Sequence, residues 1–235
     1  MLKLGYTESL GHPELRREIT RLYQSVNPEN VLVLAPEEGI FIAMNTLLKK
    51  GDEVIVTSPG YQSLYEIAGA LGCTVKRWEP EYNEGWEFHI RHLAQLINKK
   101  TRMLIVNFPH NPTGATIHSD TQARMLEMAK EHDCILFSDE MYRYLENQEE
   151  DRLSSCADLY DQAISLGGMS KAYALAGLRI GWLTTKNESW IEKFSTFRDY
   201  TTICNSAPSE ILALMGLNAK DQILRRNHDI IRYNK

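Results

Sequence analysis

A lysine among small neighbours is the residue of this sequence best suited to covalent chemistry. Lys171 follows an apolar run at 163–166, and Arg179 comes eight positions later, ahead of another apolar run. Burial and a nearby cation lower the pKa of a lysine, and its neutral amine can then attack a carbonyl. An isolated lysine is more often a surface residue on a turn, but the small and apolar neighbours favour a partly desolvated pocket here.

Two other polar residues come directly after apolar runs. Asp139 follows the run 134–138, and Asn111 lies in a turn-forming segment just past the run 102–107. Ligands of open parallel sheets bind beyond the carboxyl ends of the strands. Asp139 could therefore form an ion pair, bind a metal or pair with a cofactor. Metal is the weakest of these, because no set of His, Asp and Glu at metal spacing accompanies it. Asn111 could organise its turn or donate its amide to a ligand.

The rest of the pattern supplies strands and helices that could position these residues. Short apolar runs alternate with longer segments of helical spacing, which is typical of a mostly parallel sheet flanked by helices. Ser119 is the expected cap of one of these helices. The predicted strands are 31–35, 53–57, 73–78, 102–107, 134–138, 163–166 and 180–184, and the predicted helices are 37–49, 61–71, 90–97 and 119–132.

The composition excludes several classes of protein. The chain has 235 residues, 43% of them hydrophobic, and a formal net charge of −5, which gives no electrostatic attraction to nucleic acids or anionic membranes. No apolar run approaches the roughly 20 residues of a membrane span, and the N-terminus lacks the apolar core of a signal peptide. Cys73, Cys134, Cys156 and Cys204 are scattered, which predicts reduced thiols of a cytoplasmic protein rather than zinc ligands or disulfides.

Both ends of the sequence are abrupt. The chain opens on a turn into an amphipathic helix at 10–17 and closes inside a charged helical stretch at 224–233 that has no stop signal. We therefore expect a domain cut out of a longer protein. The charged run 146–151 predicts an exposed loop.

Three segments, taken in their order and spacing, resemble the class I and II aminotransferases, which are fold-type I pyridoxal-phosphate enzymes. The resemblance covers essentially the whole chain, and it implies a three-layer α/β/α large domain with a mostly parallel seven-stranded sheet. It assigns 1–216 to this domain and 217–235 to the start of a helix leading to a small C-terminal domain. The segments are Asn111-Pro112-Thr113-Gly114, Asp139-Glu140-Met141-Tyr142 and Ser170-Lys171 with Arg179, and further matches are Gly11-His12-Pro13-Glu14-Leu15-Arg16, Gly51-Asp52-Glu53-Val54 and Pro59-Gly60-Tyr61.

The resemblance implies roles for the residues around the ring of pyridoxal 5'-phosphate. Lys171 would hold the cofactor as a Schiff base and later move the substrate's Cα proton. Asp139 would pair with the pyridine nitrogen and keep it protonated, so that the ring accepts electrons from Cα. Asn111 and Tyr142 would donate hydrogen bonds to the phenolic oxygen of the ring. Tyr61 would stack on the face of the ring, or is an ordinary core aromatic.

Other residues would surround the cofactor phosphate. Arg179 would clamp it with a planar set of donors, and Ser170 is a further expected cofactor contact. The loop at Pro36 and Glu37 corresponds to the segment that wraps the phosphate in the family. Tyr6 matches the position from which family members reach the phosphate of a partner subunit, or is a surface tyrosine near the terminus.

The phosphate loop departs from the family pattern. Pro36 has no N–H to donate, and Glu37 brings a negative charge where a small hydroxyl residue is usual. Glu37 must therefore point away from a bound phosphate or weaken it. Gly168 also stands in place of the usual Ser or Thr, and together these changes predict weaker retention of the cofactor. The arginine that binds the substrate carboxylate in the family lies in a C-terminal domain beyond this sequence.

The function expected from the resemblance is transfer of an amino group between an amino acid and a 2-oxo acid by a cytoplasmic homodimer. Other fold-type I activities remain open: a lyase, decarboxylase, racemase or oxidase could use the same residues. A non-catalytic sensor domain and a truncated, inactive paralogue are further alternatives. A dinucleotide-binding domain is set aside, because the segment 35–39 does not supply the required glycine-rich turn.

Overall fold

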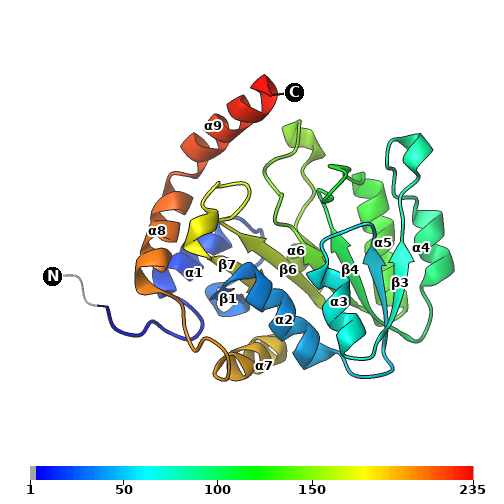
Figure 1. Cartoon of the computed structure of the whole chain (residues 1–235), viewed down its shortest axis with the longest axis horizontal. Coiled ribbons are helices and arrows are strands. Elements are labelled where there is room, and N and C mark those ends of the chain that lie inside the picture. The colour runs from blue at the N-terminus through cyan, green and yellow to red at the C-terminus, as the bar shows by residue number, and fades with distance from the viewer. Residues whose placement is uncertain (1–3, 235) are drawn as a thin grey trace.

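The computed structural model describes residues 4–234 and contains one seven-stranded sheet with helices on both faces (Figure 1). Every predicted strand forms, with ends that differ by at most three residues from the prediction. The strands are β1 (Val31–Leu34), β2 (Glu53–Thr57), β3 (Thr74–Trp78), β4 (Thr101–Asn107), β5 (Ile135–Asp139), β6 (Ala163–Gly168) and β7 (Gly181–Thr184). Their order across the sheet is β1-β7-β6-β5-β4-β2-β3.

Strand β7 is the one strand of this sheet that runs against its neighbours. It pairs antiparallel with both β1 and β6, whereas β2 to β6 pair in parallel with one another. Glycines allow close packing at this point. A Cβ atom at Gly167 would lie 2.6 Å from Nε1 of Trp182, and one at Gly181 would lie 2.7 Å from Cγ of Pro36. The expectation of a mostly parallel sheet is confirmed.

The helices divide between the two faces of the sheet (Figure 1). One face carries α2 (Pro36–Leu47), α3 (Ser63–Ala70) and α7 (Glu188–Arg198), which pack on a core that includes Leu34, Val56 and Phe137. The other face carries α1 (Pro13–Thr20), α4 (Ile90–Leu96), α5 (Ser119–Glu131), α6 (Cys156–Leu159) and α8 (Ala207–Asn218). Successive strand residues point to opposite faces, so both layers of helices cover apolar side chains.

The last helix, α9 (Lys220–Tyr233), runs on from α8 and contacts the segments that follow β5 and β6. The Nδ2 group of Asn227 donates to the carbonyl of Ala172 at 2.8 Å, and Nε2 of His228 lies 2.9 Å from the carbonyl of Tyr144. Helix α8 continues past residue 216 to Asn218. The division into 1–216 and 217–235 stays a prediction.

Two local expectations were wrong. Ser119 does not cap α5, because the backbone of the residue before it, His118, is extended and Ser119 is already the first helical residue. In the charged run 146–151, Glu146 is buried and lies 3.4 Å from Nε of Arg152, which draws the start of the run inward. The rest of the run is exposed as predicted and ends in a short 3-10 helix, Glu149–Asp151.

The cysteines are free thiols, as predicted, and no helix among residues 4–234 is long and apolar enough to cross a membrane. Burial raises the pKa of both Cys134 and Cys156 to about 12, so these two thiols are packing residues rather than nucleophiles.

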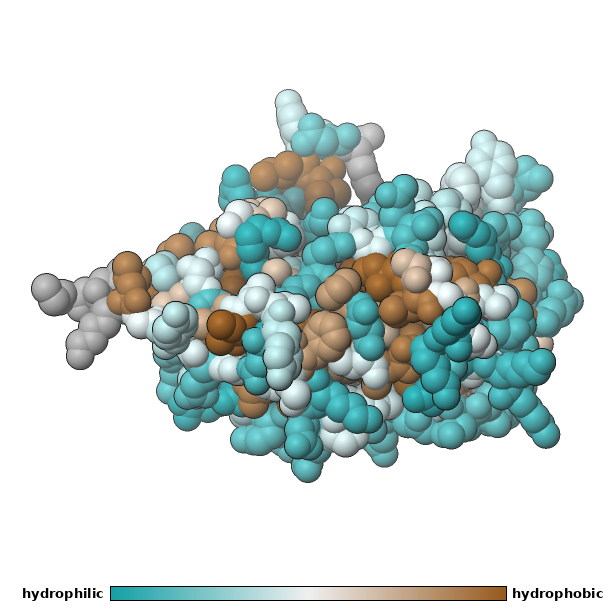
Figure 2. Space-filling model, turned by 60° about the horizontal axis from the view of Figure 1, so that its bottom comes forward, coloured by the Kyte–Doolittle hydropathy of each residue, from teal (hydrophilic) through white to brown (hydrophobic). Residues whose placement is uncertain are grey.

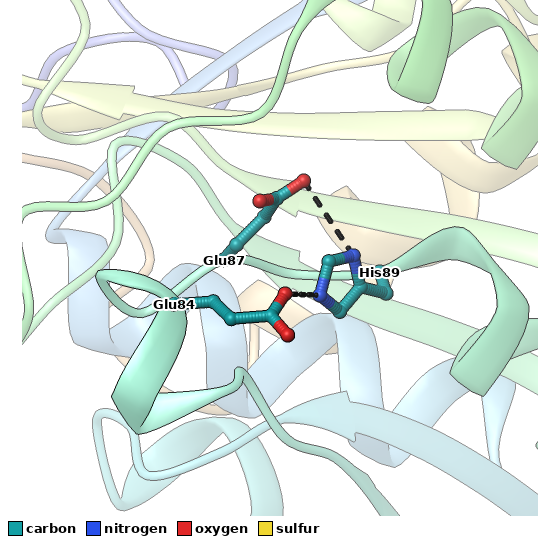
Figure 3. A group of neighbouring side chains, drawn as sticks. All are labelled: Glu84, Glu87 and His89. Atoms are coloured by element: carbon teal, nitrogen blue, oxygen red, sulfur yellow. Dashed lines mark hydrogen bonds and ion pairs between the residues drawn. The ribbon is translucent and has the colours of Figure 1, made fainter.

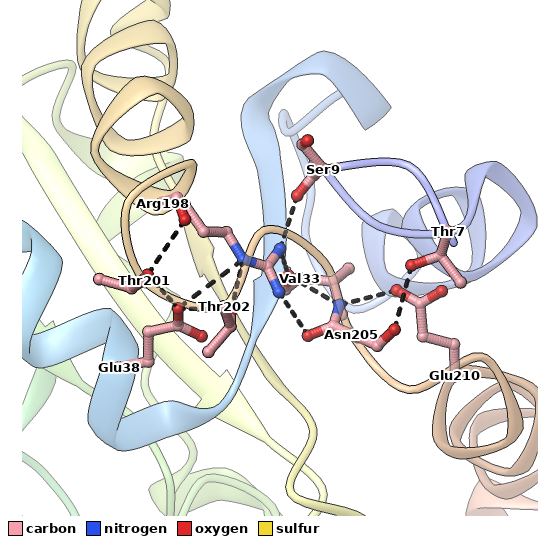
Figure 4. Close-up of polar contacts among 9 residues, drawn as sticks. All are labelled: Thr7, Ser9, Val33, Glu38, Arg198, Thr201, Thr202, Asn205 and Glu210. Atoms are coloured by element: carbon pink, nitrogen blue, oxygen red, sulfur yellow. Dashed lines mark hydrogen bonds and ion pairs between the residues drawn. The ribbon is translucent and has the colours of Figure 1, made fainter. Parts of the chain in front are cut away.

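A buried arginine ties together segments that are far apart in the sequence (Figure 4). The side chain of Arg198, the last residue of α7, is fully buried. Its Nη1 donates to the carbonyls of Ser9 at 2.5 Å and Val33 at 2.6 Å, and its Nη2 donates to Oδ1 of Asn205 at 2.6 Å. Glu38 of α2 lies 3.8 Å from its Nε. One guanidinium therefore fixes the N-terminal segment, β1 and α2 against each other.

We expect Arg198→Met to lower the free energy of unfolding by about 3 kcal/mol, because it leaves buried carbonyl oxygens without their donor and a carboxylate without its neighbouring positive charge. Urea denaturation followed by circular dichroism measures the loss. Arg225→Met on the exposed side of α9 is the matched control and is expected to change stability by less than about 0.5 kcal/mol. Equal effects of the two substitutions would contradict the role given to Arg198.

Candidate active site

The carboxyl ends of β1, β2, β4, β5 and β6 meet at one edge of the sheet, and the antiparallel β7 begins there. A cavity of about 240 Å³ opens at this edge. It is lined by Pro36, Glu37, Ile40, Tyr61, Asn111, Asp139, Met141, Tyr142, Leu166, Ser170, Lys171, Ala176 and Arg179. The structure thus brings together every predicted site residue except Tyr6, from segments spread over more than half of the chain.

Asp139 forms the buried floor of the cavity. It is the last residue of β5 and is 5% exposed, and its Oδ1 accepts a hydrogen bond from the backbone N–H of Met141 at 3.1 Å. Burial raises the pKa of Asp139 to about 7, against the opposing effects of this hydrogen bond and of the positive charge of Lys171. A buried carboxylate of this kind is stabilised by a cationic ligand.

The raised pKa makes the stability of the cofactor-free chain depend on pH. The folded chain holds the Asp139 proton up to about pH 7, whereas an unfolded aspartate loses it near pH 4. The stabilising contribution is therefore complete below about pH 4 and is lost as the pH rises to about 7. An asparagine at this position carries no proton to lose. We therefore expect Asp139→Asn to become more stable than the unchanged chain as the pH rises from about 4 to about 7, by up to about 4 kcal/mol at 1.4 kcal/mol per pKa unit. Urea denaturation at pH 5 and pH 8 measures the difference in stability between the two chains. The same difference at both pH values would contradict this.

Asn107, which was not predicted as a site residue, connects two residues that were. It is buried at the end of β4, directly opposite Asp139 in the sheet. Its Nδ2 donates to the carbonyl of Asp139 at 3.0 Å, and its Oδ1 accepts from the backbone N–H of Asn111 at 2.8 Å. The sequence did contain a sign of this role, because Asn107 is a polar residue at the end of an apolar strand, as Asp139 is.

Glu140, next to the buried aspartate, was also missed as a positioning residue. Its Oε1 accepts from Oγ of Ser155 at 3.1 Å, from Oγ of Ser165 at 2.8 Å and from the backbone N–H of Cys156 at 2.9 Å. Burial raises the pKa of this carboxyl, while the three hydrogen bonds favour its ionised form. Glu140 therefore fixes the turn between Asp139 and Tyr142 to β6 and α6.

Lys171 lies above the ring of Tyr142, with Nζ 5.7 Å from the ring centroid. It is exposed, so the expectation of a partly desolvated lysine was wrong for the chain as described. The reason is that the neighbouring residues Ala174, Ala176 and Gly177 are small and themselves exposed. The amine is consequently free to reach a ligand in the cavity.

Arg179 ends the 3-10 helix Ala176–Leu178 with a left-handed backbone, φ 55° and ψ 37°. This conformation costs a non-glycine residue about 1 kcal/mol, and such strain concentrates at functional sites. Nη1 of Arg179 donates to the carbonyl of Ala176 at 2.9 Å, and the side chain lines the cavity. The backbone turn thus brings a cation into the wall of the cavity that the start of α2 also lines.

The start of α2 contributes Pro36 and Glu37 to the cavity wall. Glu37 accepts a hydrogen bond from Oη of Tyr61 at 2.9 Å and another from Oγ of Ser63. Gly168 is buried and is not a lining residue, because it packs against Met141, whose Sδ would lie 3.1 Å from an added Cβ.

Ser170 presents a buried hydroxyl that has no hydrogen-bond partner in this structure. Tyr6 lies outside the cavity and is 91% exposed. Its predicted role toward a partner subunit stays a prediction.

A separate group of side chains lies between β3 and α4 (Figure 3). Nε2 of His89 is 2.6 Å from Oε2 of Glu84, and its Nδ1 is 3.5 Å from Oε1 of Glu87. Both imidazole nitrogens already face carboxylates, and both glutamates are exposed. The group is thus explained by pairing among its own members, and none of the three lines the cavity.

A ligand cavity at the carboxyl edge of a mixed sheet, with a lysine and a buried acid in its wall, defines an α/β protein of the small-molecule-binding class. The profile of the family described as aminotransferase class I and II matches residues 3–233. The chain belongs to this family, which confirms the resemblance seen in the sequence.

Individual relatives agree. The chain is 31% identical over 228 residues to an aspartate aminotransferase of Sulfurisphaera tokodaii, covering 93% of this chain and 57% of the relative. It is 28% identical to a capreomycidine synthase of Streptomyces vinaceus, over 97% of this chain and 58% of that protein. The crystal structure of a PLP-dependent aminotransferase from Streptococcus suis superposes with a TM-score of 0.92 at 32% identity, over 99% of this chain and 62% of that one. The chain therefore spans about three fifths of these relatives.

Proposed function

We propose that this chain is the cofactor-binding part of a pyridoxal-phosphate-dependent aminotransferase, which moves an amino group between an amino acid and a 2-oxo acid. The observation that carries the proposal is the shared cavity of Lys171 and Asp139, an amine just after β6 and a buried acid at the end of the neighbouring strand β5. Membership of the class I and II aminotransferase family supports it.

The residues present fit pyridoxal phosphate. The buried hydroxyl of Ser170 has no hydrogen-bond partner and lines the cavity, so a phosphate oxygen would satisfy it. Arg179 and the N-terminus of α2 supply positive charge to the same space. Asn111 and Tyr142 line the same cavity and would offer an amide and a phenol to a polar substituent of the ring.

Bound pyridoxal phosphate supplies an electron-accepting ring that stabilises the carbanion left when the substrate loses its Cα proton. Lys171 would hold the cofactor and would carry that proton as a general base and acid. Asp139 would form a charge pair that keeps the pyridine nitrogen protonated. The burial of Asp139 would strengthen this pair, because little water would screen it.

We also propose a cytoplasmic homodimer. Apolar side chains are exposed in patches among hydrophilic ones (Figure 2). The exposed apolar residues of the chain include Leu4, which is 69% exposed, and Met215, which is 60% exposed, and Tyr6 is free to reach another chain. The free thiols suit a reducing compartment. Sedimentation equilibrium tests the dimer, and a monomer at micromolar concentration would contradict it.

A single-turnover experiment tests the reaction. The chain is loaded with pyridoxal phosphate and mixed with L-aspartate, the substrate that the names of several relatives suggest, without any 2-oxo acid. We expect up to one equivalent of the corresponding 2-oxo acid per bound cofactor. Carbon dioxide or free ammonia in its place would indicate a decarboxylase or a lyase instead.

A further inference from the structure

Glu37 and Glu38, the two carboxylates in the first turn of α2, bind different neighbours. Glu38 accepts hydrogen bonds from Oγ1 of Thr201 and of Thr202, each at 2.7 Å, beside the buried Arg198 (Figure 4). Glu37 instead lines the cavity and faces the segment that follows β2. Glu38 thus binds α2 to the segment that follows α7. Glu37 takes no part in that contact.

The position of Glu37 is unfavourable for an anion-binding site. The N-terminus of a helix attracts anions, and a carboxylate in its first turn competes with them. The negative charge of Glu37 reaches into the cavity, since it contributes to the raised pKa of Asp139. A phosphate in this cavity would therefore be repelled by Glu37, unless the carboxylate is directed elsewhere.

The contacts of Glu37 direct it to Tyr61. Its Oε2 accepts the phenol of Tyr61 at 2.9 Å, and its Oε1 accepts the hydroxyl of Ser63. Ser63 is the first residue of α3 and Tyr61 lies two residues before it, so the carboxylate connects the first turn of α2 to the start of α3. The Tyr61 side chain is 45% exposed, and packing alone does not fix a ring so open to solvent.

We propose that Glu37 is a positioning residue, which holds the ring of Tyr61 against the cofactor by accepting the hydrogen bonds of Tyr61 and Ser63. The inference rests on the proposed function, because it takes pyridoxal phosphate as the ligand of the cavity. An aromatic ring fixed before binding loses no side-chain freedom when the cofactor arrives, which improves affinity.

The first test needs no cofactor. The hydrogen bond to Glu37, helped by burial and by the carboxylate charge, raises the pKa of the Tyr61 phenol above its ordinary value. Titration of ¹³C-labelled tyrosines by NMR, with Tyr61→Phe to assign the signal, should show this raised pKa and its return toward the ordinary value in Glu37→Ala. An unchanged Tyr61 pKa in Glu37→Ala would overturn the proposal.

The second test measures the dissociation constant for pyridoxal phosphate. We expect Glu37→Ala to weaken binding about threefold to tenfold, although it removes a negative charge. Glu37→Gln, which keeps an acceptor for the phenol, should restore most of the affinity. In a Tyr61→Phe background, Glu37→Ala should cause no further loss. Tighter binding by Glu37→Ala in the unchanged background would mean that the carboxylate only repels the phosphate, and would overturn the proposal.

Glu66→Ala is the matched control, because it removes an exposed carboxylate from the same helix that carries Ser63. Its affinity and its Tyr61 titration should equal those of the unchanged chain. The two proposals fail separately. Absence of cofactor binding by the unchanged chain overturns the proposed function and this inference together. Normal binding by the unchanged chain and by Glu37→Ala alike overturns only the role of Glu37.

Discussion

Replacing Lys171 with alanine is expected to lower exchange of the substrate Cα proton with solvent by about a thousandfold or more. The substitution removes both the covalent attachment of the cofactor and the base that carries the proton. Lys171→Arg should fail as fully, because a guanidinium stays protonated and cannot act as a base. Loss of the Cα proton signal of L-aspartate in deuterated water, followed by NMR, measures the rate.

The matched control is Lys99→Ala, which removes an exposed lysine that does not line the cavity. Its exchange rate should equal that of the unchanged chain. Circular dichroism should show that Lys171→Ala remains folded, since the side chain is exposed and only its end faces the ring of Tyr142. A Lys171→Ala variant that retains a tenth of the exchange rate would contradict the assigned role.

The second large effect is expected for Asp139→Asn in the cofactor-loaded chain. The amide keeps the shape of the side chain but cannot balance the charge on a protonated pyridine nitrogen. Removing one partner of a buried charge pair costs about 3–5 kcal/mol, which corresponds to a roughly 200-fold to 5000-fold slower Cα proton exchange. Cofactor affinity should fall less than this rate, because the charge pair matters most when the ring accepts electrons.

Asp120→Asn makes the same substitution at an exposed position of α5 and should leave the exchange rate unchanged. Stability and reaction rate are also predicted to change in opposite directions in Asp139→Asn. The cofactor-free variant is expected to be more stable than the unchanged chain at pH 8, while the loaded variant is slower. A variant that is slower only because it is less stable would contradict the assignment.

The sequence predicted the strands and most of the site because both depend on local pattern. Apolar runs bounded by turn residues marked every strand, and polar residues just beyond those runs marked Asp139, Asn111 and Lys171. Residues at the ends of parallel strands necessarily meet at one edge of the sheet. The family resemblance then supplied their roles, which the chemistry of the residues alone left open.

What the sequence could not predict depends on contacts between distant segments. The partners of Arg198 include carbonyls 165 and 189 residues away, and a carbonyl has no signature in the sequence. The direction of Glu37 depends on Tyr61 and Ser63, which lie 24 and 26 residues further on. Lys171 is exposed because its small neighbours do not cover it, and their arrangement is set by the fold. Ser119 failed as a cap because the backbone of His118 is extended and α5 already begins at Ser119.

The most direct test of the central claim is to map the cofactor on the chain. The purified protein is incubated with pyridoxal phosphate, reduced with borohydride, digested and examined by mass spectrometry. We predict a single stoichiometric adduct on the peptide that contains Lys171, and none in Lys171→Ala. A folded sample with no adduct at Lys171, or with adducts spread over exposed lysines such as Lys99, would contradict the account.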